Sequence, residues 1–420
     1  MQIIGTKRLV VALASALALT AGSAAHAATF STTVVSGDNV TEPGIDVGPD
    51  NAIYVNGPTG LLSNLPGSPS NLYRSDDAGA TWKLTPYSLR ANLPGGGDFD
   101  ISIDPKTNTL YSTDLWLGSA TVGKSTDDGN SWVANPLQGV VIQDRQWVAT
   151  SGGGVVYHAT HQIPAGLIVS KSLPPADGIV YPLSTVAATP LDQTGCVCPP
   201  GNLIAEGSGA MAGLTDKVGL IYATSSGGVN FARSTNGATT FTSTTVSPAS
   251  SAATNGNFPV VANGGGGHLF AVWQEVAGNS STVHFASSAD WGATWSAPRA
   301  LVSSGTSVFP WVAAKGSKVS VSLYNTAASG TPDNVPAGAQ WFETYLQSTD
   351  GGATFSAPTT VDQTPAKTGP ICTEGINCSS GRELGDFQSL TLDNAGAADL
   401  AYVHSFDGTD TEIRFAHQTG

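Results

Sequence analysis

Three arginines in this chain have the chemistry to hold an anion. Arg90, Arg145 and Arg382 each stand in a loop shortly before a run of alternating apolar residues. A guanidinium presents paired N–H donors in a rigid fork, which fits a carboxylate better than the point charge of lysine does. We expect the three side chains to gather on one side of the fold as a clamp for an acidic ligand. The alternative is that they are ordinary surface arginines.

Carboxyl groups occur in the same kind of loop. The acidic candidates are Asp98, Asp100, Asp144 and Asp386. Two segments match each other, because 144–147 (DRQW) and 385–388 (GDFQ) both place an Asp before an aromatic residue and an alternating run. Such an Asp can bind a ligand or move a proton. It can equally accept backbone hydrogen bonds and brace the chain.

Aromatic and imidazole groups complete the set. The rings that could stack on a sugar are Trp116, Trp147, Trp311 and Phe387, and their alternative role is packing between strands. His158 and His161 follow a tyrosine in one run, and His404 ends another. Residues three apart on a strand face opposite sides, so only one of His158 and His161 can line a given site. A structural, hydrogen-bonded histidine is the alternative for all three.

Short strands that recur along the chain must position these candidates. Alternating apolar runs begin near Gly44, Asp100, Gln146, Ala212, Pro259, Pro310 and Gln388. Each run is followed by a turn and a second strand rich in aromatic and β-branched residues: AIYV, TLYST, VVYHATH, VGLIYAT, LFAVWQE, VSVSLYN and ADLAYVH. These seven pairs predict an all-β propeller of seven four-stranded antiparallel blades. If the third or fourth pair is an insertion, the number of blades is six.

The motif Ser-x-Asp-x-Gly-x-Thr-Trp repeats between the strand pairs. Near-complete copies are 75–82 (SDDAGATW), 125–132 (STDDGNSW), 288–295 (SADWGATW) and 348–355 (STDGGATF). A worn copy, 234–241 (STNGATTF), has lost the Asp and shifted the Gly, and in the third pair 173–178 occupies the same place. The Asp can accept N–H groups of its own turn, and the Gly can adopt a positive φ. The recurrence indicates a repeat fold.

These copies resemble the Asp-box, or bacterial neuraminidase repeat, of sialidase-type β-propellers, from about residue 40 to the end of the chain. In that family the box lies between the third and fourth strands of a blade, on the face opposite the active site. The resemblance therefore implies that Arg74 and Arg233, which precede boxes, point away from the active site. Arg299 and Arg414 fall on strands distant from the channel.

The resemblance implies a secreted, glycan-processing exo-glycosidase that acts on an acidic sugar, with no cofactor or metal. Asp144 then becomes the acid/base candidate, and Glu275 with Tyr324 the candidate nucleophile pair. The chain departs from the family in its blade number, since these sialidases usually have six, and in lacking their N-terminal Arg-Ile-Pro motif. Two alternatives remain open: a non-catalytic glycan- or protein-binding propeller, and a polysaccharide lyase that uses a His and a Tyr.

Residues 1–27 read as a signal peptide, with Lys7 and Arg8 before an apolar stretch and a small-residue cleavage site at Ala27. We expect residues 28–420 to form one exported, monomeric propeller domain without a membrane span. Removal of Lys7 and Arg8 leaves 15 basic and 31 acidic residues, a net charge of −16, which excludes non-specific nucleic-acid binding. Thr29 to Ser36 should supply the outer strand of the last blade and close the ring.

The cysteines are Cys196, Cys198, Cys372 and Cys378. An even number in an exported chain predicts disulfides. Cys372–Cys378, which closes a small loop, with Cys196–Cys198 is the favoured pairing. Because the Cys196–Cys198 ring is very tight, a cross-pairing stays open. A metal site is the rival explanation, and no histidine lies near either pair in sequence.

Overall fold

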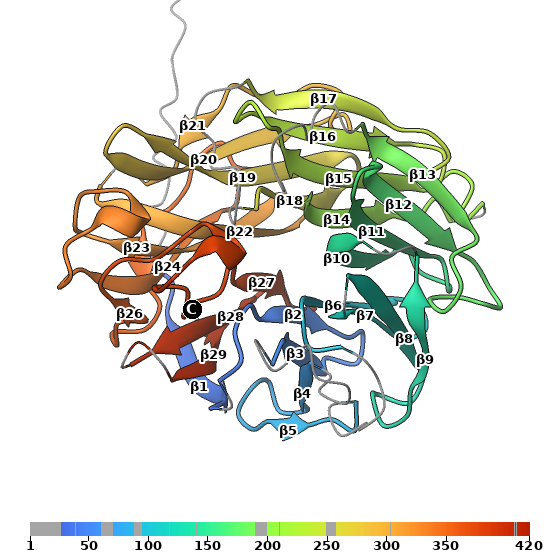
Figure 1. Ribbon diagram of the computed structural model, residues 1–420, viewed down its shortest axis with the longest axis horizontal. Coiled ribbons are helices and arrows are strands. Elements are labelled where there is room, and N and C mark those ends of the chain that lie inside the picture. The colour runs from blue at the N-terminus through green and yellow to red at the C-terminus, as the bar shows by residue number, and fades with distance from the viewer. Residues whose placement is uncertain are drawn as a thin grey trace, which may run out of the picture.

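The computed structural model describes residues 27–37, 39–59, 70–87, 95–116, 118–139, 142–189, 200–209, 211–248, 258–302, 304–406, 408 and 410–420. Their strands form seven antiparallel sheets arranged as blades around a central channel (Figure 1). The predicted seven-bladed, all-β propeller is thus confirmed. Among these residues no helix has the length and apolar character needed to cross a membrane.

Each blade is built from strands that run from the channel outward, in chain order except in the last blade. Blade one contains β2 (Gly44–Val47), β3 (Ile53–Gly57), β4 (Asn71–Ser75) and β5 (Lys83–Leu84); blade two contains β6 (Phe99–Ile103), β7 (Leu110–Trp116), β8 (Ser119–Ser125) and β9 (Val133–Gln138); blade three contains β10 (Gln143–Thr150), β11 (Val156–Gln162), β12 (Gly166–Ser172) and β13 (Leu183–Ala188). Blade four contains β14 (Pro200–Glu206), β15 (Lys217–Ala223), β16 (Val229–Ser234) and β17 (Thr242–Ser247); blade five contains β18 (Val260–Gly265), β19 (His268–Ala277), β20 (Ser280–Ser288) and β21 (Arg299–Ala300). Blade six contains β22 (Thr306–Lys315), β23 (Lys318–Thr326), β24 (Gln340–Ser348), β25 (Thr359–Thr360) and the added β26 (Lys367–Thr368); blade seven contains β27 (Ser389–Leu392), β28 (Ala398–Ser405), β29 (Thr411–Gln418) and β1 (Phe30–Ser36). Among the described residues, the 3-10 turns η3 (Pro332–Asn334) and η4 (Gly375–Asn377) lie in blade six and in the loop before blade seven.

The N-terminal strand closes the ring, as predicted. β1 pairs antiparallel with β29, from Phe30 opposite Gln418 to Ser36 opposite Ile413. Backbone hydrogen bonds join Thr29 to Gly420 and Thr419 beyond the last pair. The two ends of the chain therefore share one sheet, and their pairing closes the ring.

The inner strand of blade four differs from the prediction. The apolar alternation predicts it near Ala212, but the strand beside the channel is β14, and Ala212 lies in the turn between β14 and β15. Asp216 holds that turn by accepting the N–H groups of Ser208 and Gly213 and the hydroxyl groups of Ser151 and Tyr157. An acid that closes a turn interrupts the alternation from which the strand was inferred.

Polar side chains on the inner strands join successive blades. Asp46 Oδ2 accepts the N–H of Ile103 at 2.8 Å, and Asp100 Oδ2 accepts that of Val148 at 2.8 Å. Asn202 does the same between blades four and five, where its Oδ1 accepts the N–H of Val261 at 2.8 Å. Burial raises the pKa of Asp46 to about 6 and that of Asp100 to about 7. An acid and an amide thus make the same contact between blades, but only the acid titrates.

The Asp-boxes adopt one local geometry. In the first, Ser75 Oγ accepts the N–H of Gly79 at 2.9 Å and donates to Asp77, which accepts both the N–H and the hydroxyl of Thr81. The equivalent acids are Asp127, Asp290 and Asp350. In the worn copy Asn236 takes the position of the acid and Ala238, with φ of 60°, that of the glycine.

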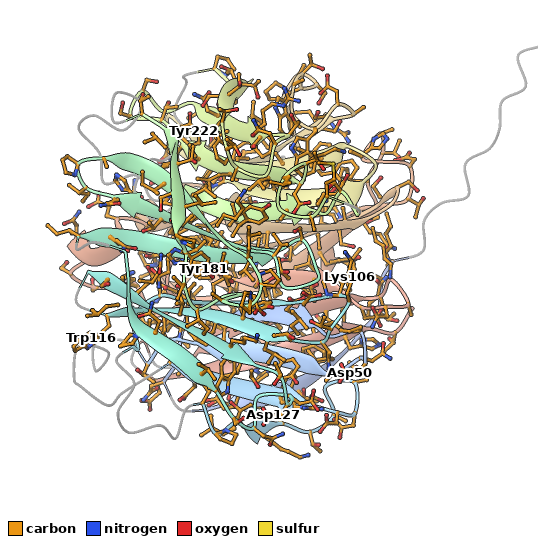
Figure 2. The ribbon with its side chains drawn as sticks, turned by 90° about the vertical axis from the view of Figure 1, so that its right-hand side faces the viewer. Asp50, Lys106, Trp116, Asp127, Tyr181 and Tyr222 are labelled. Carbon is orange, nitrogen blue, oxygen red and sulfur yellow. A yellow bond between two sulfur atoms is a disulfide. The ribbon has the colours of Figure 1, made fainter. Side chains whose placement is uncertain are left out.

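The aromatic residue that ends a box packs on the third strand of the preceding blade. Trp82 contacts Phe415 at a ring-centroid distance of 5.2 Å, and Trp295 contacts Phe231 at 5.6 Å. The boxes connect third to fourth strands, so they share one face with the turns between first and second strands. We call this the bottom face, and the face with the loops that lead into each blade the top face. Figure 2 shows the ring from the side, with Trp116 on the top face, at the left of the view, and Asp50 and Lys106 on the bottom face, at the right.

Candidate functional site

Ionisable side chains from several blades meet on the top face, at the end of the central channel. They come from the loops or first strands of blades seven, one, two and three. The charges of Asp386, Asp98, Arg382 and Arg145 all act on Glu42, and those of Asp98, Arg145 and Asp386 act on Asp144. We call this group the mouth: Glu42, Asp98, Asp144, Arg145, Arg382 and Asp386.

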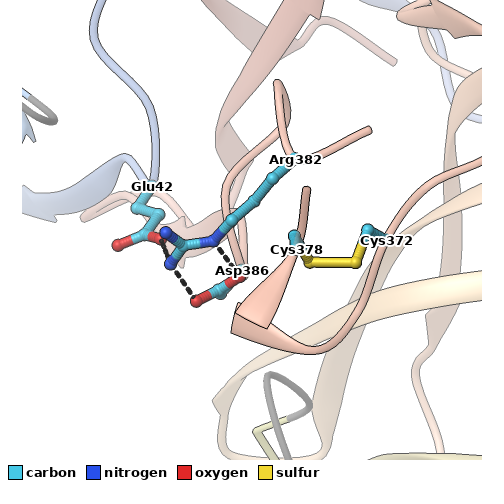
Figure 3. The surroundings of a disulfide bond; sticks show 5 residues. All are labelled: Glu42, Cys372, Cys378, Arg382 and Asp386. Carbon is cyan, nitrogen blue, oxygen red and sulfur yellow. Dashed lines mark hydrogen bonds and ion pairs between the residues drawn. A yellow bond between two sulfur atoms is a disulfide. The ribbon is translucent and has the colours of Figure 1, made fainter. Parts of the chain in front are cut away.

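Arg382 links blade seven to blade one across the closure of the ring. Its Nε and Nη2 donate to the carboxylate of Asp386 at 3.0 and 2.5 Å, and Nη2 also donates to Glu42 Oε1 at 3.2 Å (Figure 3). Burial, followed by the charges of Asp386 and Asp98, raises the pKa of Glu42 well above its usual value. Arg382 is therefore occupied by two carboxyl groups, one of which tends to keep its proton.

The loop that carries Arg382 is closed by a disulfide. Cys372 and Cys378 are bonded, as predicted, and the N–H of Cys372 donates to the carbonyl of Gly381 at 2.9 Å. The crosslink and this hydrogen bond lie immediately before Arg382 and brace it at the mouth (Figure 3). Cys196 and Cys198 fall outside the described residues, as does Arg90.

Asp98 and Asp144 form a carboxyl pair at the partly buried rim of the mouth. Burial is the largest cause that raises the pKa of Asp144 well above its usual value, and the charge of Asp98 and a hydrogen bond between the two side chains add to it. Two carboxyl groups can hydrogen-bond only if one of them carries a proton. Across the sheet, His161 lies in register with Asp144. The pair thus places Asp144, whose protonated form is favoured, beside a second carboxyl group.

Arg145 lies beneath this pair and is 2% exposed. It is the extra residue of a β-bulge, since the register of β10 against β11 shifts between Asp144 and Gln146. Its guanidinium stacks at 3.8 Å over the ring of Trp147 and at 4.5 Å over that of Phe387. Nη1 donates weakly to the carbonyl of Gln146 at 3.4 Å, whereas Nε and Nη2 find no hydrogen-bond partner in the described part of the chain.

Four aromatic rings form the floor of the mouth. Trp147 lies 6.0 Å from Trp311, 6.2 Å from Phe258 and 5.7 Å from Phe387, measured between centroids. All four are at most 8% exposed, so their faces are covered by one another and by Arg145. Trp147, Trp311 and Phe387 also line a channel of about 300 Å³ below them, which the side chains of Asp46 and Asp100 border. The rings separate the mouth from this channel.

Glu275 and Tyr324 are not brought together. Tyr324 is fully buried, and its hydroxyl accepts the N–H of Val403 at 2.8 Å, whereas Glu275 lies 3.4 Å from His284 within blade five. The acid in register with Tyr324 is Glu343 on β24, and burial raises its pKa well above the usual value. The sequence signal that could have identified Glu343 is an acidic residue inside the largely apolar run WFETYLQS. Glu42, also missed, precedes the first inner strand as Asp386 precedes the last.

The other histidines lie away from the carboxyl groups of the mouth. His158 Nε2 is 3.1 Å from the Thr113 hydroxyl, and His404 is fully buried between the rings of Tyr402 and Phe406. Burial lowers the pKa of each of these two to about 4. Both imidazoles are therefore neutral at pH 7.

No protein-family model and no curated protein matches the chain. Among solved structures, a protein of unknown function from Dyadobacter fermentans aligns with a TM-score of 0.51 at 14% identity, covering 92% of this chain and 97% of the other. The lectin BP39L from Burkholderia pseudomallei also reaches 0.51, at 12% identity, covering 91% and 97%. The α-L-arabinanase of Penicillium chrysogenum gives 0.49 at 12% identity, covering 93% and 96%. At these identities the likeness shows the propeller fold alone.

Proposed function

We propose that the mouth is the active site of a secreted exo-glycosidase, with Asp144 as the proton donor. The observation that carries the proposal is the position of Asp144 beside Asp98 at the mouth, where burial, followed by the charge of Asp98, favours the protonated form of Asp144. Glycoside hydrolysis commonly uses two carboxyl groups, one to protonate the leaving oxygen and one as the carboxylate that assists from the other side. Buried tyrosines such as Tyr324 have no part in this version of the reaction.

The steps assigned to the chain are few. Asp144 gives its proton to the glycosidic oxygen as the bond to the anomeric carbon breaks, and Asp98 provides the negative charge that stabilises the developing oxocarbenium ion. A water molecule then forms the new bond to the anomeric carbon and gives up a proton, which restores the protonated form of Asp144. His161, in register with Asp144, lies where it can contact a sugar hydroxyl.

For the substrate we propose an acidic sugar. Its carboxylate would be recognised by Arg145, whose Nε and Nη2 have no partner among the described residues. Glu42 and Asp144 both tend to hold protons, which reduces the repulsion between the mouth and an anion. Arg382 already binds Asp386 and Glu42. Its positive charge contributes to the electrostatic potential of the mouth, but its guanidinium is not available to bind the carboxylate of the sugar.

The test compares two Asp→Asn variants on opposite faces. Aryl glycosides of sialic acid, of a uronic acid and of neutral sugars are offered at about pH 5, and release of the aryl group is followed. We expect cleavage of an acidic glycoside by the wild type and a loss of roughly 10²–10⁴-fold in Asp144→Asn, as for removal of a general acid. Asp290→Asn is the matched control, because Asn236 already occupies that position in the worn box.

Binding measurements decide between the proposal and its alternative. Titration of the same free sugars into the protein, followed by calorimetry, reports affinity without turnover. Saturable binding with no cleavage of any glycoside would make this a glycan-binding propeller, the class to which the Burkholderia lectin of similar fold belongs. If an unsaturated product appears with a uronic polysaccharide, the lyase alternative holds instead. A protein that neither binds nor cleaves any of these sugars would refute the glycan function of the mouth.

A further inference from the structure

Three potential metal ligands converge on the bottom face of blade seven, far along the strands from the mouth. Asp393 lies in the turn between β27 and β28, Asp399 near the start of β28 and His417 near the end of β29. One donor atom from each residue lies within 4.8 Å of the other two. We propose that these residues bind a divalent transition metal ion of the zinc class. The proposal is independent of the function of the mouth.

The local fold holds the three side chains in place. Asp399 and His417 are directly opposite each other in the antiparallel pair of β28 and β29. The turn that carries Asp393 is closed by backbone hydrogen bonds from Asp393 to Ala397 and from Gly396 to Asp393, and Asp393 Oδ1 accepts the N–H of Ala397 at 2.7 Å. Both strands lie inside a four-stranded sheet, so the ligands stand on rigid elements.

Asp399 gives a second indication of a bound cation, separate from the convergence of the three side chains. Its side chain is fully buried, and while Oδ1 lies 2.7 Å from His417 Nδ1, Oδ2 has no hydrogen-bond partner within the described residues. A buried carboxylate oxygen left without a donor is costly. A cation between Asp393, Asp399 and His417 would satisfy it and would replace the proton that now lies between Nδ1 and Oδ1.

The donor set favours one class of ion. An imidazole nitrogen with carboxylate oxygens suits Zn²⁺ and its neighbours, whereas Ca²⁺ and Mg²⁺ prefer oxygen ligands alone. Two ammonium groups lie nearby, but Lys315 donates to the carbonyls of Asp393 and Asn394 and Lys318 to that of Gly396. Both lysines thus donate to backbone carbonyls and not to the ligand side chains, but their charges weaken the attraction for a dication, so we expect micromolar affinity.

The experiment is a calorimetric titration of the tag-free, full-length mature protein with Zn²⁺ at about pH 7.5. We expect one saturable site in the wild type and at least a tenfold weaker affinity in both His417→Asn and Asp393→Asn. Asp393 is only partly buried, so its variant should fold even if a change at Asp399 does not. The matched control is His284→Asn, which removes a histidine beside a single carboxylate, Glu275, and should leave the affinity unchanged.

Each result bears on the proposal. Loss of the site in His417→Asn and Asp393→Asn, with retention in His284→Asn, supports it. Absence of saturable Zn²⁺ binding in the wild type at 100-fold molar excess overturns it. Equal affinity in all variants, or equal loss in His284→Asn and His417→Asn, also overturns it, because the metal would then bind to surface histidines without using this cluster.

Discussion

The carboxyl groups of the Asp-boxes and those of the mouth are the same chemical groups in opposite states. Asp290 lies exposed on the bottom face, and hydrogen bonds from Thr294 and Ser288 lower its pKa to about 2. At the mouth, burial and like charges raise the pKa of Glu42 and Asp144 well above the usual value. The first environment stabilises a charge that has only a structural role. The second retains protons that could be transferred.

The two environments also differ in how they are assembled. The Ser and Asp side chains of a box make their hydrogen bonds within its own eight residues, as Ser288 and Asp290 do. The mouth depends on contacts such as that between Arg382 and Glu42, which are 340 residues apart in sequence. Closure of the ring should therefore matter far more for the mouth than for any one box.

The largest expected effect is removal of the closing strand. Deletion of residues 29–36 would expose the edge of β29 and uncover the apolar contact between blades seven and one, to which Val35 contributes. We expect loss of the cooperative thermal transition near the wild-type melting temperature and a tendency to aggregate. Circular dichroism melts and size-exclusion chromatography measure both. A deletion variant that melted at the wild-type temperature would show that β1 does not stabilise the ring.

Next in size is the effect of Arg145→Ala on ligand binding. A guanidinium–carboxylate contact in a partly desolvated site contributes roughly 1.5–3 kcal/mol, which corresponds to about one to two orders of magnitude in affinity. We expect that loss for an acidic sugar and a smaller one for a neutral sugar. Arg74→Ala is the bottom-face control, because Arg74 pairs with Asp76 and Asp128 beside boxes.

A second measurement separates binding from bracing. Arg145 stacks on Trp147 and Phe387, so its removal also takes contacts from the aromatic floor. If Arg145→Ala lowers the melting temperature while affinity for acidic and neutral sugars falls equally, the guanidinium only supports the floor. Titration of both sugars beside a thermal melt of each variant distinguishes these outcomes.

How well the sequence predicts each region depends on whether its contacts are made between residues near or far apart in sequence. The box repeats and strand pairs revealed the ring and its blade number, because each of these signals lies within a few residues. The closing strand was inferred because the last blade had no outer strand of its own before Gly420. The inner strand of blade four was misplaced because Asp216 draws its partners from Ser151 and Tyr157 in another blade. The candidate loops of the mouth were found, but the partners within it were not. Tyr324 faces Glu343 and not Glu275, which depends on the register of β23 against β24.

Asp46 and Asp100 on the inner strands differ from the Asp-box acids in how they make stability depend on pH. The folded pKa values of Asp46 and Asp100, about 6 and about 7, lie above the ordinary carboxyl value because both groups are buried. The folded state therefore binds more protons, and this contribution to stability is fully present below about pH 4 and is lost as the pH rises through 6 to 7. The boxes act in the opposite sense, since the pKa of Asp290, about 2, makes their contribution present above about pH 4 and lost in stronger acid.

The double variant Asp46→Asn, Asp100→Asn should flatten the decline of stability between pH 4.5 and 7.5. An asparagine keeps the acceptor for the next blade's N–H, as Asn202 does between blades four and five. We expect a gain at pH 7.5 on the order of 1 kcal/mol or more for each replaced carboxyl. Urea unfolding at several pH values measures it. An unchanged slope would mean that other groups, including the net acidic charge, cause the decline.

The smallest expected effect belongs to the box itself. Asp290→Ala removes the acceptor for the N–H and hydroxyl of Thr294 and for the hydroxyl of Ser288, all of them beside solvent. Water can replace part of these contacts, so we expect the free energy of unfolding to fall by no more than about 1 kcal/mol. Asp290→Asn should lose less, because Asn236 makes the same contact with the N–H of Thr240. Activity or sugar affinity per folded molecule should stay at the wild-type value in both variants, since the box lies on the face opposite the mouth. A folded Asp290→Ala protein with abolished sugar binding would place the functional site on the bottom face and remove the basis for assigning the two sets of carboxyl groups to different roles.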